Sequence, residues 1–465
     1  MTRTAMTRYE FLDVARGVIL IIMSLDHANI FWHCRAMPMM ERRWQYHNQT
    51  GVPYDGDFAE SFTRQISHLC APGFALIMGW AMLLTTNKRS AKDWSYAAQM
   101  KEITKRGFFT SLTTAVPEGF GFSIGKSLGW NDRIPKTRPQ DRGGMPFGIL
   151  AALMSTMFWS APLMFIICSK LKGPGKRRAR TITFSIVGFL LCAVAWSFDL
   201  TRPMSETTKR DTSYPADIVY RYFAAGGPTV PKKSWYFSFP VLLLAGPAFW
   251  GMAFANEAVE WLKDGKRQTM RRALTVTGCS SVLAFFIVRG IIVTDPMLKD
   301  NGVVGFFAVR KYPFSIEFLL WNIGWFLIII AACDVWFERV KGESKASALV
   351  LPTDAEGSTE ANPSIEAEKI DKKNDGTAKG AKSIGWIVLD KTETIGKVPA
   401  FYYVAHLNIF AVLALSVSLG EGQCVAIWWP YLVTIAANYL LMDRVCRWFF
   451  DFKVRRGPKS VWRFW

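Results

Sequence analysis

Apolar residues occur along this chain in blocks of about 20, the length that a helix needs to cross a bilayer. Ten blocks are predicted to be membrane-spanning helices: residues 11–32, 67–87, 106–124, 147–169, 181–198, 236–256, 273–294, 314–336, 399–418 and 426–449. The third and the fifth are the weakest. The expected fold class is therefore all-α, a polytopic membrane helix bundle of about ten transmembrane helices.

Basic residues mark one side of this predicted bundle. The chain of 465 residues is half hydrophobic and has a formal net charge of +19. Its Lys and Arg gather in short segments between apolar blocks, chiefly 170–180 and 263–272, which the positive-inside rule places in the cytoplasm together with both termini. No basic face interleaved with aromatic residues occurs, so the expected partner is a lipid bilayer and not a nucleic acid. The sequence does not distinguish an endomembrane or lysosomal location from the plasma membrane.

One segment differs in composition from the rest. Residues 341–383 are rich in Lys, Glu, Ala, Ser, Thr and Gly, and no aromatic residue occurs between Phe337 and Trp386. Such a segment has too little apolar surface to offset the entropy of ordering, so we expect a disordered cytoplasmic insertion. It divides a membrane domain into a first part at 1–340 and a last part at 384–465, with two helices and a basic tail.

Charged groups inside an apolar block are costly, about 2.5–3.5 kcal/mol each near its centre, and so indicate function. The first block carries Asp26 and His27 in its outer half, and Arg16 lies eleven residues earlier on nearly the same helix face. Because imidazole titrates near neutral pH, His27 is a candidate general base or acyl carrier. Asp26 is expected either to support it or to orient a neighbouring helix. The alternative is that both residues only pack helices together.

His406, near mid-depth of the block at 399–418, is a second histidine that is either catalytic or a packing residue. Lys311, Tyr312 and Glu317 open the block at 314–336 from the outer side, where capping of the helix is an alternative role for Glu317. Arg289 is expected to snorkel to the membrane surface, with pairing to Glu317 or Asp26 as the alternative.

Sequence motifs of several common metal sites and enzyme classes are missing from this chain. The eight cysteines form no CxxC pair and no histidine stands at zinc-finger spacing, so no metal site is expected. A Walker A loop, an HExxH motif and a dinucleotide fingerprint are also missing from the sequence. Nucleotidase, zinc protease and dehydrogenase chemistry is therefore not expected.

Ordered sequence segments resemble a known family. The phrase FLDVARG at 11–17, followed by MSLDH at 23–27, is similar to the opening of the transmembrane acyltransferase superfamily. The similarity is closest to the branch with the heparan-alpha-glucosaminide N-acetyltransferase catalytic domain. Segments 64–79, 311–324 and 395–407 and the tail at 461–465 fit the same branch in the same order.

The resemblance implies an all-helical membrane enzyme that takes an acyl group, typically acetyl from cytosolic acetyl-CoA. It would deliver that group to an amine or hydroxyl of a sugar-like acceptor on the far side of the membrane. His27 matches the expected base or transient acyl acceptor and His406 a recurring histidine, while the loop residues His33 and His47 are alternatives to His27.

The resemblance also suggests roles in binding. Arg16, Lys391 or Lys397 is expected to meet the CoA phosphates, or to serve only as a positive-inside residue. The other proposed substrate-binding residues are Lys311, Tyr312, Glu317 and Arg289.

Two other classes of function remain open. One is a membrane transporter or flippase that uses the intramembrane Asp and His groups as a proton or substrate path. The other is a catalytically inactive scaffold. The sequence does not determine the acceptor or the acyl chain. It also leaves the oligomeric state open, with a homodimer as one option.

Overall fold

The computed structural model describes residues 9–32, 58–125, 145–201, 218–225, 227–228, 235–237, 239–292, 306–307, 309, 314–349, 383–416, 428–457 and 460. Most of these residues are helical, as the apolar blocks predict. The α-helices are α1 (Glu10–Trp32), α3 (Phe58–Ser67), α4 (Cys70–Ser90), α5 (Tyr96–Gly125), α6 (Ile149–Lys170), α7 (Arg177–Thr201), α10 (Val241–Lys263), α11 (Arg267–Ile292), α14 (Ile316–Leu349), α16 (Ile384–Lys397), α17 (Pro399–Ser416), α18 (Trp428–Ala436) and α19 (Asp443–Arg456). A 3-10 turn, η3 (Pro174–Lys176), precedes α7, and two π-helical segments are η4 (Arg221–Ala225) and η5 (Ala437–Met442).

Six helices within the described residues are long and apolar enough to cross a membrane, which makes this a multi-pass integral membrane protein. They are Gln65–Ser90, Ile149–Lys170, Arg177–Ser197, Val241–Lys263, Arg267–Ile291 and Ile316–Lys341. The predicted number of about ten is not confirmed. Helix α1 is long enough but carries Asp13, Arg16 and Asp26 in its sequence. The last predicted block, 426–449, is divided between α18, η5 and α19.

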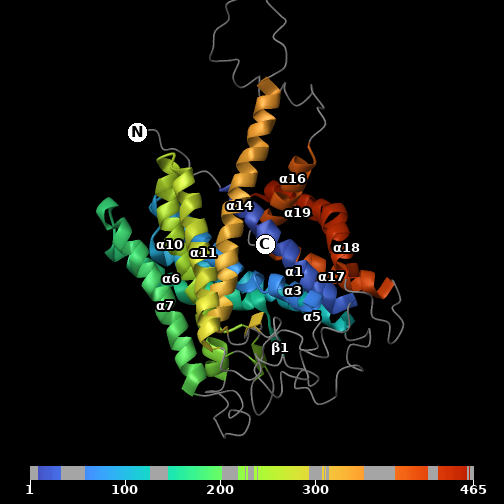
Figure 1. Cartoon of the computed structure of the whole chain (residues 1–465), viewed down its shortest axis with the longest axis horizontal. Coiled ribbons are helices and arrows are strands. Elements are labelled where there is room, and N and C mark those ends of the chain that lie inside the picture. Colours follow the sequence, from blue (N-terminus) through green and yellow to red (C-terminus); the bar gives the residue numbers. More distant parts are fainter. Residues whose placement is uncertain are drawn as a thin grey trace, which may run out of the picture.

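The structure departs from a purely helical fold at one small ladder. Strand β3 (Trp235–Phe237) pairs in parallel with β1 (Met145–Phe147) and antiparallel with β2 (Gly227–Pro228), and Tyr236 is opposite both Pro146 and Pro228. Because β1 directly precedes α6 and β3 closely precedes α10, the ladder ties together the starts of two spanning helices (Figure 1).

The ends of the predicted insertion are partly defined. Helix α14 continues to Leu349 and projects beyond its neighbours at the top of Figure 1. Residues 350–382 lie outside the described residues. The chain returns at α16, a helix that the apolar blocks do not predict, so the last part of the membrane domain holds more helices than the two expected.

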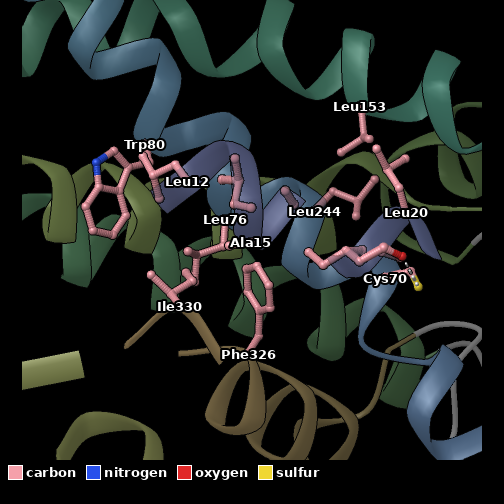
Figure 2. Packing of buried hydrophobic residues seen from close by; sticks show 14 of the residues in the cluster. Leu12, Ala15, Leu20, Cys70, Leu76, Trp80, Leu153, Leu244, Phe326 and Ile330 are labelled. Carbon is pink, nitrogen blue, oxygen red and sulfur yellow. Dashed lines mark hydrogen bonds between the residues drawn. The ribbon is translucent and has the colours of Figure 1, made fainter. Parts of the chain in front are cut away.

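Helix α1 is the centre of the arrangement. It contacts α3, α4, α14, α16, α17 and α18, while α10 packs between α4 and α7, and α11 packs along α14 (Figure 1). Figure 2 shows Leu12, Ala15 and Leu20 of α1 among the buried side chains of α4, α6, α10 and α14, which include Trp80 and Phe326. A helix with charges and a histidine is thus covered by other helices on several sides.

Glycines allow these helices to approach closely. A Cβ atom added to Gly396 of α16 would lie 1.8 Å from the Asp13 carbonyl oxygen of α1, and one added to Gly17 would lie 2.0 Å from the Thr392 carbonyl oxygen. Gly79 and Gly251 make the same kind of contact between α4 and α10. Small residues are typical of helix interfaces in membranes because backbone contact replaces a hydrophobic driving force.

We expect Gly396→Ala to destabilise the protein by about 1–3 kcal/mol, because the added methyl group must displace the backbone of α1. The apparent melting temperature in detergent, followed by tryptophan fluorescence, measures the change. Gly290→Ala in α11 is the matched control, since a Cβ atom there meets nothing within 4 Å and alanine favours a helix. An equal loss of stability in both variants would contradict the close packing of α1 on α16.

Candidate functional site

Two histidines that are 379 residues apart in the sequence are directly paired. His27 Nδ1 of α1 lies 2.7 Å from His406 Nε2 of α17. The two ring planes are 5° from parallel, with their centroids 5.0 Å apart. His406 is fully buried, whereas His27 is only partly buried. The structure therefore brings together the two histidines that the sequence marks separately as candidates.

The hydrogen bonds of this pair assign the proton on each ring. His406 Nδ1 lies 2.8 Å from the Tyr402 carbonyl oxygen, which can only accept, so Nδ1 of His406 carries a proton. In a neutral His406 ring Nε2 is then the acceptor, and His27 Nδ1 must donate to it. The neutral tautomer of His27 therefore has its basic lone pair on Nε2. This is the arrangement in which one partner holds a catalytic imidazole in a single tautomer.

Aromatic rings enclose the pair. Tyr402 stacks on His406 at 4.9 Å between centroids, and Phe410 meets His406 edge-on at 5.6 Å. Tyr403 packs edge-on against both His27 and His406. Rotation of either imidazole would cost these ring contacts, so packing and hydrogen bonding restrict the same two rings.

A second polar connection joins α1, α17 and η5 one turn from the pair. Asn438 Nδ2 donates to Ser24 Oγ at 2.8 Å and to the Thr434 carbonyl oxygen at 2.7 Å, and its Oδ1 accepts from the Tyr402 hydroxyl. Asn438, Ser24 and Tyr402 are all fully buried. Asn438 is also the second residue of η5, and π-helical segments occur frequently at functional sites.

Asp26 is directed to a different helix. Its Oδ1 accepts a hydrogen bond from Ser67 Oγ at 3.2 Å, at the end of α3. Adjacent residues on a helix point in different directions, which is why Asp26 reaches α3 while His27 reaches α17. Of the two expectations for Asp26, this contact agrees with the orientation of a neighbouring helix.

Arg16 lies at the opposite end of α1 from the pair, about 16 Å along the helix from His27 at 1.5 Å per residue. Its Nη1 donates to Asp13 Oδ1 at 2.7 Å and to the Gly396 carbonyl oxygen at 3.1 Å. Lys391 Nζ donates to the Tyr439 carbonyl oxygen at 2.5 Å, and Lys397 Nζ lies 2.7 Å from Glu393. Each cation considered for the CoA phosphates thus already has a partner within the chain.

Arg289 and Glu317 form a separate polar contact between α11 and α14. Arg289 Nη1 lies 3.9 Å from Glu317 Oε1, its Nε donates to the Phe306 carbonyl oxygen at 2.8 Å, and the residue is 5% exposed. The expectation that Arg289 snorkels is therefore wrong, and the alternative pairing with Glu317 is correct. The desolvation cost of a buried guanidinium explains why it takes a carboxylate and a carbonyl as partners.

The remaining candidates are outside the described residues: Lys311, Tyr312, His33 and His47. Among the residues that are described, no group of three or more His, Cys, Asp or Glu side chains is placed to hold a metal ion.

Sequence reasoning did not single out Asn438 or Ser67. Asn438 had a usable signal, because an amide inside the predicted span 426–449 needs a polar partner. Ser67 had none, since serine is common at the end of a helix and its partner is 41 residues away.

No protein-family model and no curated protein sequence matches this chain. The resemblance to the acyltransferase superfamily therefore stays a prediction.

We expect Asn438→Leu to lower the free energy of unfolding by about 1–3 kcal/mol, because the Ser24 and Tyr402 hydroxyls would be left buried without their amide partner. Apparent melting temperatures of Asn438→Leu, Tyr402→Phe and the double variant form a double-mutant cycle. The double variant should be less destabilised than the sum of the single ones. Additive losses would contradict the Tyr402–Asn438 bond.

Proposed function

We propose that this protein is an integral membrane acyltransferase that moves an acyl group, most simply acetyl from acetyl-CoA, to an amine or hydroxyl. His27 is the catalytic base and His406 positions it. The observation that carries the proposal is the hydrogen-bonded pair in which the Tyr402 carbonyl oxygen, the buried His406 and the partly buried His27 place the basic lone pair on His27 Nε2. The sequence resemblance to membrane acyltransferases supports the same function.

A thioester is already activated, so the protein needs only to position the acceptor and to remove its proton. The acceptor oxygen or nitrogen bonds to the acyl carbon while its proton passes to His27 Nε2. The carbon–sulfur bond then breaks, and the CoA thiolate recovers that proton from the imidazolium. His406 Nε2 continues to accept from His27 Nδ1 throughout, so it stabilises the transient positive charge. If His27 instead serves as a transient acyl acceptor, the acyl group bonds first to Nε2. That route needs the same tautomer of His27.

The charged end of the bundle supports an orientation with both termini in the cytoplasm. Ion pairs join α1 to α14 through Glu10 and Lys341, and α7 to α10 through Arg177 and Glu257. The basic segments 170–180 and 263–272 adjoin the starts of α7 and α11. By the positive-inside rule this end faces the cytosol, where acetyl-CoA is available.

His27 then lies toward the far side. It is about 26 Å along α1 from Glu10 at 1.5 Å per residue, close to the thickness of the hydrocarbon core. An acceptor approaching from the far side, such as an amino sugar or a polyol, would meet His27 near that surface. An acyl donor from the cytosol would have to extend along α1 from the region of Arg16.

The activity test uses the purified full-length protein in liposomes, with acetyl-CoA and a panel of amino-sugar and polyol acceptors. We expect His27→Asn to lower turnover about 10²–10⁴-fold, because the asparagine amide can still donate toward His406 but has no basic lone pair at the Nε2 position. Release of CoA thiol and mass spectrometry of the acceptor give the rates.

His68→Gln is the matched control, since His68 is another fully buried imidazole and its ring packs against Phe318. Unchanged turnover in His27→Asn would refute the catalytic role. A flux of acceptor across the liposome membrane that needs no acyl-CoA would instead favour the transporter alternative, which the buried polar groups of α1, α17 and η5 also fit.

Turnover should rise with pH, because His27 acts as a base only when Nε2 is unprotonated. Protonation of Nε2 removes the lone pair that takes the proton of the acceptor, so activity is lost as the pH falls. The pH–rate profile in liposomes measures the effect, and the residual activity of His27→Asn should lack it. The same profile in the wild type and in His27→Asn would assign the titration to another group.

A further inference from the structure

A groove with one polar end lies between α11 and α14, away from the histidine pair. It has a volume of about 390 Å3 and is bordered by Gln268, Arg271 and Arg272 at one end and by Val276 and Ile328 at the other. Ala331 and Ala332 lie along it, and their small side chains leave room between the two helices. Val276 is 63% exposed and Val335 is 48% exposed, so the groove opens to the outside of the bundle.

The polar end is rigid. Asp334 of α14 is fully buried and accepts from Arg267 Nε at 3.0 Å and from Arg271 Nε at 2.6 Å. Arg271 also bonds to Glu338 through Nη2. These ion pairs hold α11 against α14 at the mouth of the groove.

The mouth carries a surplus of positive charge. Three arginines at the start of α11, at positions 267, 271 and 272, stand against the two carboxylates of Asp334 and Glu338. The bonds of Arg271 to the two carboxylates use its Nε and Nη2. Arg272 is exposed beside them. An anionic group at the mouth would therefore meet a positive field and guanidinium donors.

The position of the groove along the spanning helix matches the layers of a bilayer. From Gln268 to Val276 the groove runs about 12 Å along α11, whereas the interfacial layer of a bilayer is about 5–8 Å deep on each side. The arginine end thus lies at the level of the headgroups and the valine end among the acyl chains. Acyl chains cover any lipid-facing groove, but a cationic mouth at headgroup depth selects among headgroups.

We propose that this groove binds one anionic phospholipid, with its phosphate at Arg271 and Arg272 and an acyl chain along Val276 and Ile328. The site is separate from the histidine pair, and lipid binding there does not depend on the proposed acyltransferase activity. The lipid stabilises the packing of α11 on α14 by neutralising the surplus charge at the mouth.

The test is native mass spectrometry of the full-length protein in mixed micelles of phosphatidylglycerol and phosphatidylcholine with identical acyl chains. The wild type should retain one phosphatidylglycerol in preference to phosphatidylcholine. Arg272→Ala should reduce that preference about fivefold, because one cationic side chain near a lipid headgroup is lost. Val276→Trp, at an exposed position, should fill the groove, remove the bound lipid and abolish the stabilisation that phosphatidylglycerol gives the wild type.

Arg178→Ala is the matched control, an exposed arginine near the start of α7 and outside the groove. Retention that is unchanged in Arg178→Ala supports the site. An equal reduction in Arg178→Ala and Arg272→Ala would show general surface attraction and overturn the proposal. Retention without headgroup preference, or displacement of the lipid by acetyl-CoA, would also overturn it.

Discussion

The arrangement of the helices depends on the polar groups of α1, which must be enclosed by other helices. Helix α1 carries Asp13, Arg16, Asp26 and His27 through the middle of a membrane protein, and lipid offers none of these groups a partner. Asp13 pairs with Arg16 within α1, and helices that contact α1 supply the other partners: Arg16 meets the Gly396 carbonyl oxygen of α16, Asp26 meets Ser67 of α3, and His27 meets His406 of α17. Each polar group of α1 thereby specifies which helix lies next to it.

Two kinds of contact hold the helices around α1 together. Glycines let backbones touch where helices cross, as at Gly17 and Gly396, and so supply van der Waals contact that the membrane does not drive. Buried hydrogen bonds such as that of Asn438 to Ser24 fix the register, because a shift of one residue would leave a polar group unsatisfied. The histidine pair is held by hydrogen bonds and by the aromatic rings packed on it, which restrict the orientation of the proposed base.

The ends of the bundle are electrostatically different from its middle. Near the start of α11, Asp334 is neutralised by Arg267 and Arg271. Arg272 lies beside them, at the groove between α11 and α14. In the histidine site the Tyr402 carbonyl oxygen, and not a carboxylate, is the acceptor for His406 Nδ1. The chain thus places its net charge at a membrane surface and its titratable pair within the bundle.

Much of this was determined by the sequence alone. The apolar blocks determined the helical class and most helix positions, because a bilayer imposes a minimum length on any apolar span. The cost of burying ionisable groups likewise marked His27 and His406 as candidates, whereas the pairing of Arg289 with Glu317 was only the alternative to snorkelling. The predicted number of about ten spanning helices is not confirmed: six helices qualify among the described residues, while α1 carries charges and the last block is divided by the π-helical segment η5.

The partners were decided only by the tertiary structure. A helix period shows that Asp26 and His27 face different ways, but not that α3 and α17 lie in those directions. Nor does it place Asn438 beside Ser24, 414 residues away. Hydrogen bonds between helices depend on distance in space, and in a bundle that distance is set by packing of the whole chain. The sequence therefore determined which groups require a partner, and the fold decided that two of its histidines are partners for each other.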